Sequence, residues 1–318
     1  MNKKYLRVTL LVAVLGLICA APVPAQTLIN CKTRSCYERL VDDYLAALVA
    51  HDPSRIAFAE DARFVENIKA TKIGEGLWKT ASATPATFRI YVPDPVSGQV
   101  GFMGVMQEGG KPILLGLRLQ VFEGHVFEAE HVIARDLDAE SLANLKVVRP
   151  IFTKVTPEGM RMPRYDIKGI AYSYYDALDF NDGELAPMAR DCDRHENGRE
   201  SSGSRAPVTA KTPHPNYSAM DCTRQFSTGM MAYIDNIDNI RVVAVDPVTG
   251  LAFGLSHFHH SMKNHVFPIK GVPGVTQRQV NNAPFDLPAA HIFKISGGKI
   301  HQIEAMGFLA PYNSPSGW

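Results

Sequence analysis

The sequence has no excess of charge of either sign. Its 318 residues include 33 Lys and Arg against 32 Asp and Glu, which gives a formal net charge of +1. Nucleic-acid binding leaves a basic patch or stripe as its electrostatic footprint, so no nucleic-acid partner is expected. The sequence also lacks a glycine-rich phosphate loop, a Gly-x-Ser-x-Gly turn and a Cys-x-x-Cys pair. These absences argue against nucleotide cofactors, serine-hydrolase chemistry and thioredoxin-like redox chemistry.

Long apolar runs are absent after the N-terminal region. At the N-terminus, basic residues precede an apolar run over residues 8–21, and residues 23–25 (Val-Pro-Ala) have the small-x-small pattern of a signal-peptidase site. The run is shorter than the roughly 20 apolar residues that span a bilayer, which disfavours a retained anchor. We therefore expect a signal peptide over residues 1–25 and a secreted or periplasmic protein with no stable membrane anchor.

Cysteine is scarce, with five residues in the whole chain, one of them inside the expected signal peptide. The other four are Cys31, Cys36, Cys192 and Cys222. In an oxidising compartment paired thiols are the default, and four cysteines allow three connectivities. We favour a short clip from Cys31 to Cys36 and a link from Cys192 to Cys222 that ties down an insertion. A free thiol nucleophile is the alternative, but nothing beside a cysteine marks it as activated.

What the sequence does contain is an internal repeat. Residues 44–67 align without a gap on 174–197, residues 93–105 align on 245–257, and residues 117–130 align on 291–304. The three matches occur in the same order, which indicates a tandem duplication. We therefore predict a first domain over 26–135, a connector over 136–161 and a second domain over 162–318. Two long insertions distinguish the second half, near 199–221 and 262–287.

Each half has the same order of expected elements. An apolar stripe of helical period runs over residues 37–48 and again over 167–178. Alternating and apolar segments separated by hairpin signals follow, at 100–106, 113–121 and 126–133 and then at 251–259, 291–295 and 299–306. The pattern predicts two tandem α+β domains.

This pattern resembles the nuclear transport factor 2-like superfamily, which includes ketosteroid isomerase and SnoaL-like polyketide cyclases. The residues that carry the resemblance are a Tyr-x-x-Ala-Leu helix, a segment ending in Glu-Asn at residues 66–67 and 196–197, and a closing Gly-x-Ile-x-x-Ile-Glu hairpin at 298–304. The resemblance implies a cone in each half, in which a curved antiparallel sheet wraps around N-terminal helices and encloses an apolar pocket. In enzymes of the group a carboxylate or histidine inside the cone moves protons, whereas other members only bind or dimerise, so the fold alone assigns no chemistry.

The two halves differ at three positions where an apolar residue is replaced by histidine. The second half has His291, His257 and His195 at the places of Leu117, Val105 and Val65. Strand alternation puts position 117 on the apolar face, and burying an unpaired imidazole costs a few kcal/mol, so we predict a polar site inside the second cone. Histidine also titrates near neutrality, as proton transfer requires. A one-residue slip in register would reverse any of these faces, and an inward histidine can simply be a hydrogen-bonded core residue.

Two helix residues complete the predicted catalytic set. Tyr174 repeats as Tyr44, which favours core packing but allows a phenol that reaches the pocket, and Asp176 replaces Ala46 as a candidate orienting carboxylate. Glu196 repeats as Glu66, which favours a structural role in both halves. Alternate residues 257 and 259 would suit a metal, but no third ligand is evident, so we expect neither a metal nor another cofactor.

Together these features predict a secreted, cofactor-free lyase, isomerase or cyclase. It would carry out proton-transfer chemistry, as dehydration, isomerisation or cyclisation, on a hydrophobic oxygenated small molecule. The second half would carry the working pocket, and the more apolar first half would serve as its scaffold in an intramolecular pseudo-dimer. Two alternatives remain: a carrier that binds an apolar ligand without altering it, and an assembly module whose pocket is filled by its own side chains. Further homo-oligomerisation stays open.

Overall fold

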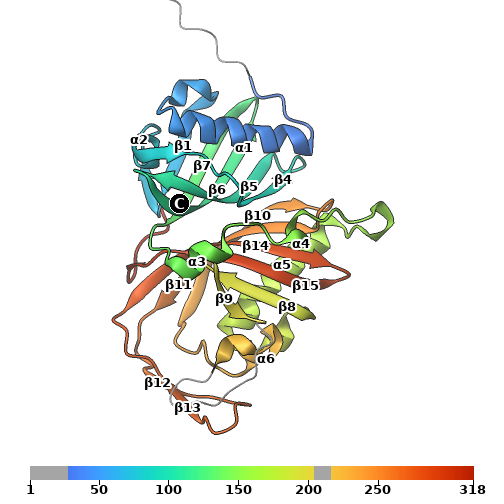
Figure 1. Ribbon diagram of the computed structural model, residues 1–318, viewed down its shortest axis with the longest axis vertical. Coiled ribbons are helices and arrows are strands. Elements are labelled where there is room, and N and C mark those ends of the chain that lie inside the picture. Colours follow the sequence, from blue (N-terminus) through green and yellow to red (C-terminus); the bar gives the residue numbers. More distant parts are fainter. Residues whose placement is uncertain (1–27, 204–215) are drawn as a thin grey trace, which may run out of the picture.

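The computed structural model describes residues 28–203 and 216–318 (Figure 1). The expected signal peptide and the middle of the first insertion lie outside the described residues. The elements of the first half are α1 (Arg34–Val49), β1 (Phe58–Glu66), β2 (Lys69–Thr71), α2 (Leu77–Thr80), β3 (Ala81–Ala83), β4 (Arg89–Asp94), β5 (Gln99–Glu108), β6 (Lys111–Phe122) and β7 (His125–Ala134). They form one sheet of order β2-β1-β7-β6-β5-β3, with β4 also paired to β5.

The second half repeats the main strands of this arrangement, but it has no counterpart of β3 and adds β16. After α3 (Ala139–Asn144) and α4 (Pro150–Thr153), its sheet has the order β10-β11-β14-β15-β8-β9, with β16 paired to β14. Its elements are α5 (Arg164–Asp179), β8 (Met188–Glu196), β9 (Arg199–Ser202), α6 (Cys222–Ser227), β10 (Asn236–Asp246), β11 (Leu251–His260), β12 (Val266–Pro268), β13 (Gln277–Gln279), β14 (Phe285–Ser296), β15 (Lys299–Gly307) and β16 (Ala310–Pro311). The predicted α+β fold of two tandem domains is confirmed.

The sheets differ from the expectation in one respect, because neither is purely antiparallel. The first strand of each domain runs parallel to the last long strand, β1 beside β7 and β8 beside β15. A parallel pair needs a long crossover connection, and here the rest of the sheet supplies it. This pairing brings the start and the end of each repeat together on the same side of the cone.

Each long helix packs its apolar stripe into its own sheet. The side chain of Thr33 caps α1 by accepting a hydrogen bond from the amide of Cys36, and the inward stripe of α1 is buried, as is the equivalent stripe of α5. Fully burying a large apolar side chain contributes about 1.5–3 kcal/mol, so this stripe fixes each helix to the concave face of its sheet. Tyr44 and Tyr174 lie at equivalent points of the two stripes, and both are fully buried.

The two sheets pack against each other through their other faces, so that the long helices α1 and α5 lie on the outer sides of the pair (Figure 1). Phe253 of β11 packs so closely on Gly101 of β5 that a Cβ atom on the glycine would lie 2.2 Å from its ring. The buried side chains of this interdomain layer include Phe88, Ile90, Met103, Leu114 and Val132 from the first domain and Val243, Leu251, Phe253, Leu255 and Ile292 from the second. Both faces of each sheet are therefore buried.

This layer corrects one prediction about β11. His257 was expected to line the cone, but Leu251, Phe253 and Leu255, which share its face of the strand, face the first domain. The cone is lined instead by the alternate residues, such as Ala252 and Phe258. Strand alternation defines two faces but does not say which covering layer each one meets.

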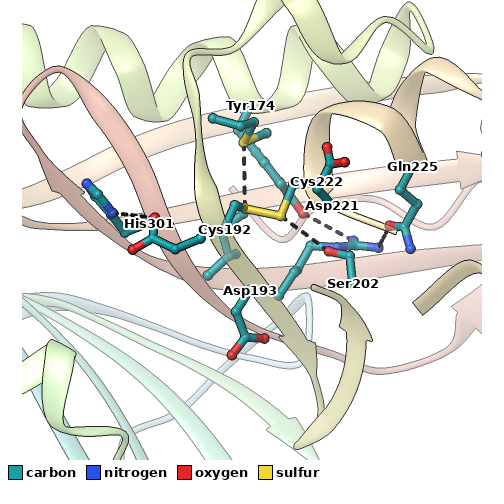
Figure 2. Close-up of a disulfide and its surroundings, with 12 residues drawn as sticks. Tyr174, Cys192, Asp193, Ser202, Asp221, Cys222, Gln225 and His301 are labelled. Atoms are coloured by element: carbon teal, nitrogen blue, oxygen red, sulfur yellow. Dashed lines mark hydrogen bonds and ion pairs between the residues drawn. A yellow bond between two sulfur atoms is a disulfide. The ribbon is translucent and has the colours of Figure 1, made fainter. Parts of the chain in front are cut away.

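Both disulfides join the pairs favoured from the sequence, Cys31 with Cys36 and Cys192 with Cys222. Figure 2 shows the second bond, which links β8 to α6 across the first insertion, with Tyr174 and Gln225 beside it. None of the helices within 28–203 and 216–318 is both long and apolar enough to cross a bilayer.

Candidate active site

A cavity of about 180 Å³ lies on the concave side of the second sheet, beneath α5. Its walls come from α5, β8, β11, β14, β15 and the segment that leads into β10. The lining residues are Tyr174, Leu178, Arg194, Glu196, Asn197, Met231, Tyr233, Ile234, Phe258, His260, Leu287, Ala289, His291, Ala305, Met306 and Gly307. The second cone therefore encloses a mostly apolar space with a few polar groups on its wall.

Arg194 is the central charge of this cavity. It occupies the place of Phe64 in the repeat and is buried. Its Nη1 donates to the Tyr174 hydroxyl at 3.3 Å and pairs with Glu196, and its Nη2 donates to Oε1 of Gln225 at 3.2 Å. Nε has no hydrogen-bond partner among the described residues. Since a buried charge is stable only when paired and hydrogen-bonded, these contacts hold the guanidinium in place and leave Nε–H as a donor for a ligand.

His291 lines the cavity as predicted and is held there as a neutral imidazole. Burial, with a further contribution from the Arg194 charge, lowers its pKa to about 3. Its Nδ1 lies 3.3 Å from the Tyr175 hydroxyl, and burial raises the pKa of that phenol well above its ordinary value. The protonated phenol can donate to Nδ1, which places the ring proton on Nε2. His291 can then donate a hydrogen bond but is not a charged acid at neutral pH.

His260 is a second cavity histidine, and it was not among the predicted site residues. Its ring stacks on Phe285 at a centroid distance of 4.1 Å and on Tyr233 at 5.4 Å. Burial lowers its pKa to about 4, and its Nδ1 has no hydrogen-bond partner within the described parts of the chain. His260 alternates with His259 along β11, so the correct choice of strand face would have identified it.

The other predicted site residues lie elsewhere. In the described part of the chain the cavity lining includes Tyr174 and His291 but neither His257 nor His195. His257 is on the interdomain side of β11, and His195 lies between the inward residues of β8, with its Nε2 3.1 Å from Asp193. Asp176 is exposed on α5, one residue past Tyr175, and so points away from the cone. The three histidines therefore do not converge on one cavity.

The first domain has a buried polar group of its own, contrary to the expectation of a uniformly apolar interior. The Tyr44 hydroxyl lies 2.9 Å from Nε2 of His131, whose Nδ1 lies 3.3 Å from Glu66. Trp78 packs edge-on against Tyr44 at 5.2 Å. Glu66 also accepts the amide hydrogen of Leu77, which fixes the short helix that carries the tryptophan. The interior of the first cone therefore holds a hydrogen-bonded group of Tyr44, His131 and Glu66, with Trp78 packed beside it.

The histidine inside the cone is on a different strand in each domain. In the first domain Leu117 of β6 pairs across the sheet with His131 of β7, and in the second His291 of β14 pairs with Ala305 of β15. The equivalent cross-strand pair thus contains one histidine in each domain, on β7 in the first and on β14 in the second. Ala305 is much smaller than His131, and this difference contributes to the space beside His291.

Each half is a curved sheet with a long helix in its hollow, and in the second half a cavity lies beneath that helix. This is the arrangement that the resemblance seen in the sequence implies. Residues 160–307, which lie in the second domain, match a family described as a domain of unknown function (DUF8021).

Solved structures match this chain over about half of its length. A polyketide cyclase candidate from Xanthomonas campestris pv. campestris is 18% identical, with a TM-score of 0.29, over 45% of this chain and 90% of that chain. An NTF2-like protein from Burkholderia thailandensis E264 is 15% identical, with a TM-score of 0.27, over 46% and 92%. No curated protein matches the chain. Likeness at this level concerns the fold alone.

Proposed function

We propose that the second domain takes a small, oxygenated and mainly apolar molecule into its cavity and moves a proton on it with side chains alone. The observation that carries this proposal is that two residues of the cavity lining, Arg194 and His260, each have a buried polar atom, Nε and Nδ1, with no partner among the described residues. Leaving such a group unsatisfied costs about 1–3 kcal/mol. A ligand oxygen and an adjacent acidic C–H would satisfy both groups.

The two groups have complementary chemistry. His260 is neutral at physiological pH because burial lowers its pKa to about 4, so Nδ1 is available as a base. It would take a proton from a carbon next to a carbonyl, and the C–H electron pair would move towards the carbonyl oxygen. Arg194 Nε–H would stabilise the negative charge that develops on that oxygen. Return of the proton to another carbon completes an isomerisation, and its departure with a β-hydroxyl as water completes a dehydration.

The size of the cavity restricts the ligand. Its volume of about 180 Å³ is below the roughly 300–1,000 Å³ of sites that bury drug-sized ligands. The walls include Leu178, Phe258 and Leu287, which suit a hydrocarbon surface. We therefore infer a compact substrate, about one ring in size, with one or two oxygen functions.

Deuterium exchange tests proton transfer before the natural substrate is known. The protein is incubated in D2O with a panel of small cyclic ketones and β-hydroxy ketones, and label uptake is followed by mass spectrometry. We expect catalysed exchange for at least one compound, with a loss of about 100-fold or more in His260→Phe, within the range that a positioned acid or base contributes. His265→Gln is the matched control, because His265 is exposed. Equal rates in His260→Phe and the wild type would refute the role of His260.

A carrier is the second candidate, and one observation favours it. Burial lowers the pKa of His291 to about 3 and that of His260 to about 4, so neither histidine supplies an acid at neutral pH. If the protein is a carrier, mass spectrometry would find a stoichiometric complex with unchanged, unlabelled ligand. The two disulfides are consistent with either function in an oxidising compartment, and we propose that the protein is exported.

A further inference from the structure

The interdomain side of β11 carries a second cluster of histidines and carboxylates, separate from the cavity. His257 and His259 are two residues apart and so share one face of the strand. Across the sheet, Asp238 of β10 pairs directly with His257, and Asp286 of β14 pairs directly with His259. Three neighbouring strands thus present four ligand-type side chains on one face.

The geometry of three of these side chains suits a metal ion. One ligand atom each from Asp238, His257 and His259 lies within 4.8 Å of the others. Nε2 of His259 is 3.1 Å from Oδ2 of Asp238, and the two imidazole rings are stacked at 4.6 Å. Ligand atoms around a tetrahedral zinc ion with bonds of about 2.0 Å are separated by about 3.3 Å. Small side-chain movements would therefore close the site around an ion.

Asp286 prepares both imidazoles for this role. It is fully buried, its Oδ2 lies 3.1 Å from Nε2 of His257, and its Oδ1 lies 2.9 Å from Nδ1 of His259. With protons on those two nitrogens, the lone pairs are on Nδ1 of His257 and on Nε2 of His259, the atom that faces Asp238. Metal-binding histidines almost always donate their other ring N–H in this way. Burial also lowers the pKa of His257, which favours the neutral ring that a metal requires.

We propose that Asp238, His257 and His259 bind a divalent transition-metal ion, with zinc as the best fit and Asp286 as the group that orients both imidazoles. Two imidazoles and one carboxylate are ligands that zinc accepts, and a water molecule would fill the fourth position because Asp238 is exposed. The ion would join β10 to β11. Asp286 also accepts the amide hydrogen of Ser314 at 2.8 Å, so the site would be linked to the C-terminal segment. It lies on the opposite face of β11 from His260 and takes no part in the proposed proton transfer.

Cobalt(II) titration of the full, tag-free protein after removal of metal with a chelator tests the proposal. We expect one equivalent of Co²⁺ with visible d–d absorption, displacement by Zn²⁺, and an increase in the thermal midpoint. Asp238→Asn and His259→Gln should abolish the signal. Asp286→Asn should weaken binding by about 10–100-fold, as loss of an orienting partner does in other metal sites. Asp238→Asn is the decisive variant because this exposed residue can be changed without disturbing the core.

Two control variants separate this site from other histidines. His301→Gln removes a comparable imidazole, 2.8 Å from Asp191, and should leave Co²⁺ binding unchanged. His195→Gln tests a separate group on β8 and β9, formed by Asp193, His195 and Glu200, whose ligand atoms are also close together. Absence of binding in the wild type, binding unaffected by Asp238→Asn, or binding lost only in His195→Gln would each overturn the assignment.

Discussion

Arg164, in the first turn of α5, forms an ion pair with Asp94, which ends β4 in the other domain. The repeat has the reciprocal pair, because Nε and Nη2 of Arg34 at the start of α1 donate to Asp246 at the end of β10, at 2.9 and 2.8 Å. Both carboxylates are almost fully buried. Reciprocal contacts of this kind are the signature of a two-fold interface between identical subunits. The duplication has retained such an interface inside one chain.

Neutralising one of these carboxylates should loosen the two domains. Asp94→Asn leaves the guanidinium of Arg164 without its charged partner, and removal of one member of a buried pair is strongly destabilising. The arginine side chains are 29% and 32% exposed, so water screens the pairs in part. We therefore expect the free energy of unfolding to fall by about 2 kcal/mol, less than for a fully buried pair. Urea denaturation measures it. Glu75→Gln, in the exposed pair with Lys79, should leave the midpoint unchanged, and an equal change in both variants would contradict the interpretation.

Replacing Arg194 by phenylalanine, the residue at the equivalent position of the first domain, should reduce activity while the protein stays folded. Arg194→Phe restores the apolar residue found at Phe64, and it leaves no unpaired charge buried because the side chain of Glu196, the ion-pair partner, is 49% exposed. We expect a folded protein whose deuterium exchange falls by at least about 100-fold, since loss of one transition-state donor costs that much. Circular dichroism reports the fold and exchange reports the function. Retained exchange would show that the guanidinium is not part of the chemistry.

The acid stability of the protein should depend on His291. Its folded-state pKa is about 3, below the value of about 6.5 for an unfolded chain, so the unfolded state binds more protons between these two pH values. Stability is therefore complete above about pH 6.5 and falls as the pH decreases, with a slope of up to about 1.4 kcal/mol per pH unit from this group.

His291→Leu, the residue of the first domain, should remove that part of the slope. Denaturant unfolding between pH 4 and pH 7 measures it. Phe293→Leu is the comparison, because a neighbouring core change should lower stability by a similar amount at every pH. A slope unaltered by His291→Leu would show that this imidazole is not buried in the neutral form.

The bond between Cys192 and Cys222 should support both stability and the cavity. The cysteines are 30 residues apart, and closing a loop of that length contributes about 3–4 kcal/mol by the chain-entropy relation. The bond also anchors α6, whose Gln225 accepts from Arg194. Cys192→Ala/Cys222→Ala should therefore lower the urea midpoint and also slow deuterium exchange. Cys31→Ala/Cys36→Ala, which opens a separation of only 5 residues, should have a smaller effect on stability, about 2 kcal/mol, and none on exchange.

Sequence and structure agree most closely where one local pattern decides the outcome. The helical stripes of residues 37–48 and 167–178 could be identified because apolar side chains recur at helical spacing and end at polar turns. Tyr174 lies on the helical stripe of residues 167–178, and His291 takes the place of Leu117 on an apolar strand face, so both could be placed in the cone from the repeat. Asp176 was wrongly included because a charged residue that differs between the repeats need not point inward.

The cavity as a whole could not be predicted for a physical reason. Both faces of β11 are buried, one beneath α5 and the other against the first domain. Strand alternation therefore did not show which of the two apolar faces lines the cone. This is why His257 was preferred to His260. Arg194 was not predicted because Glu196, two residues further on, repeats as Glu66. That repeat suggested that the segment has the same structural role in both domains. The proposed third ligand beside His257 and His259 was not predicted because Asp238 lies next to them only through the pairing of β10 with β11.

By itself, then, the amino-acid order determined the duplication, the helices and the α+β class, because each depends on local periodicity or on self-similarity along the chain. Only the tertiary structure decided which histidines share a space, because that choice depends on the register of β10, β11 and β14 and on the layer that covers each face of the sheet. Because the two domains pack together, one face of β11 lines the cavity and the other carries the histidines of the proposed metal site.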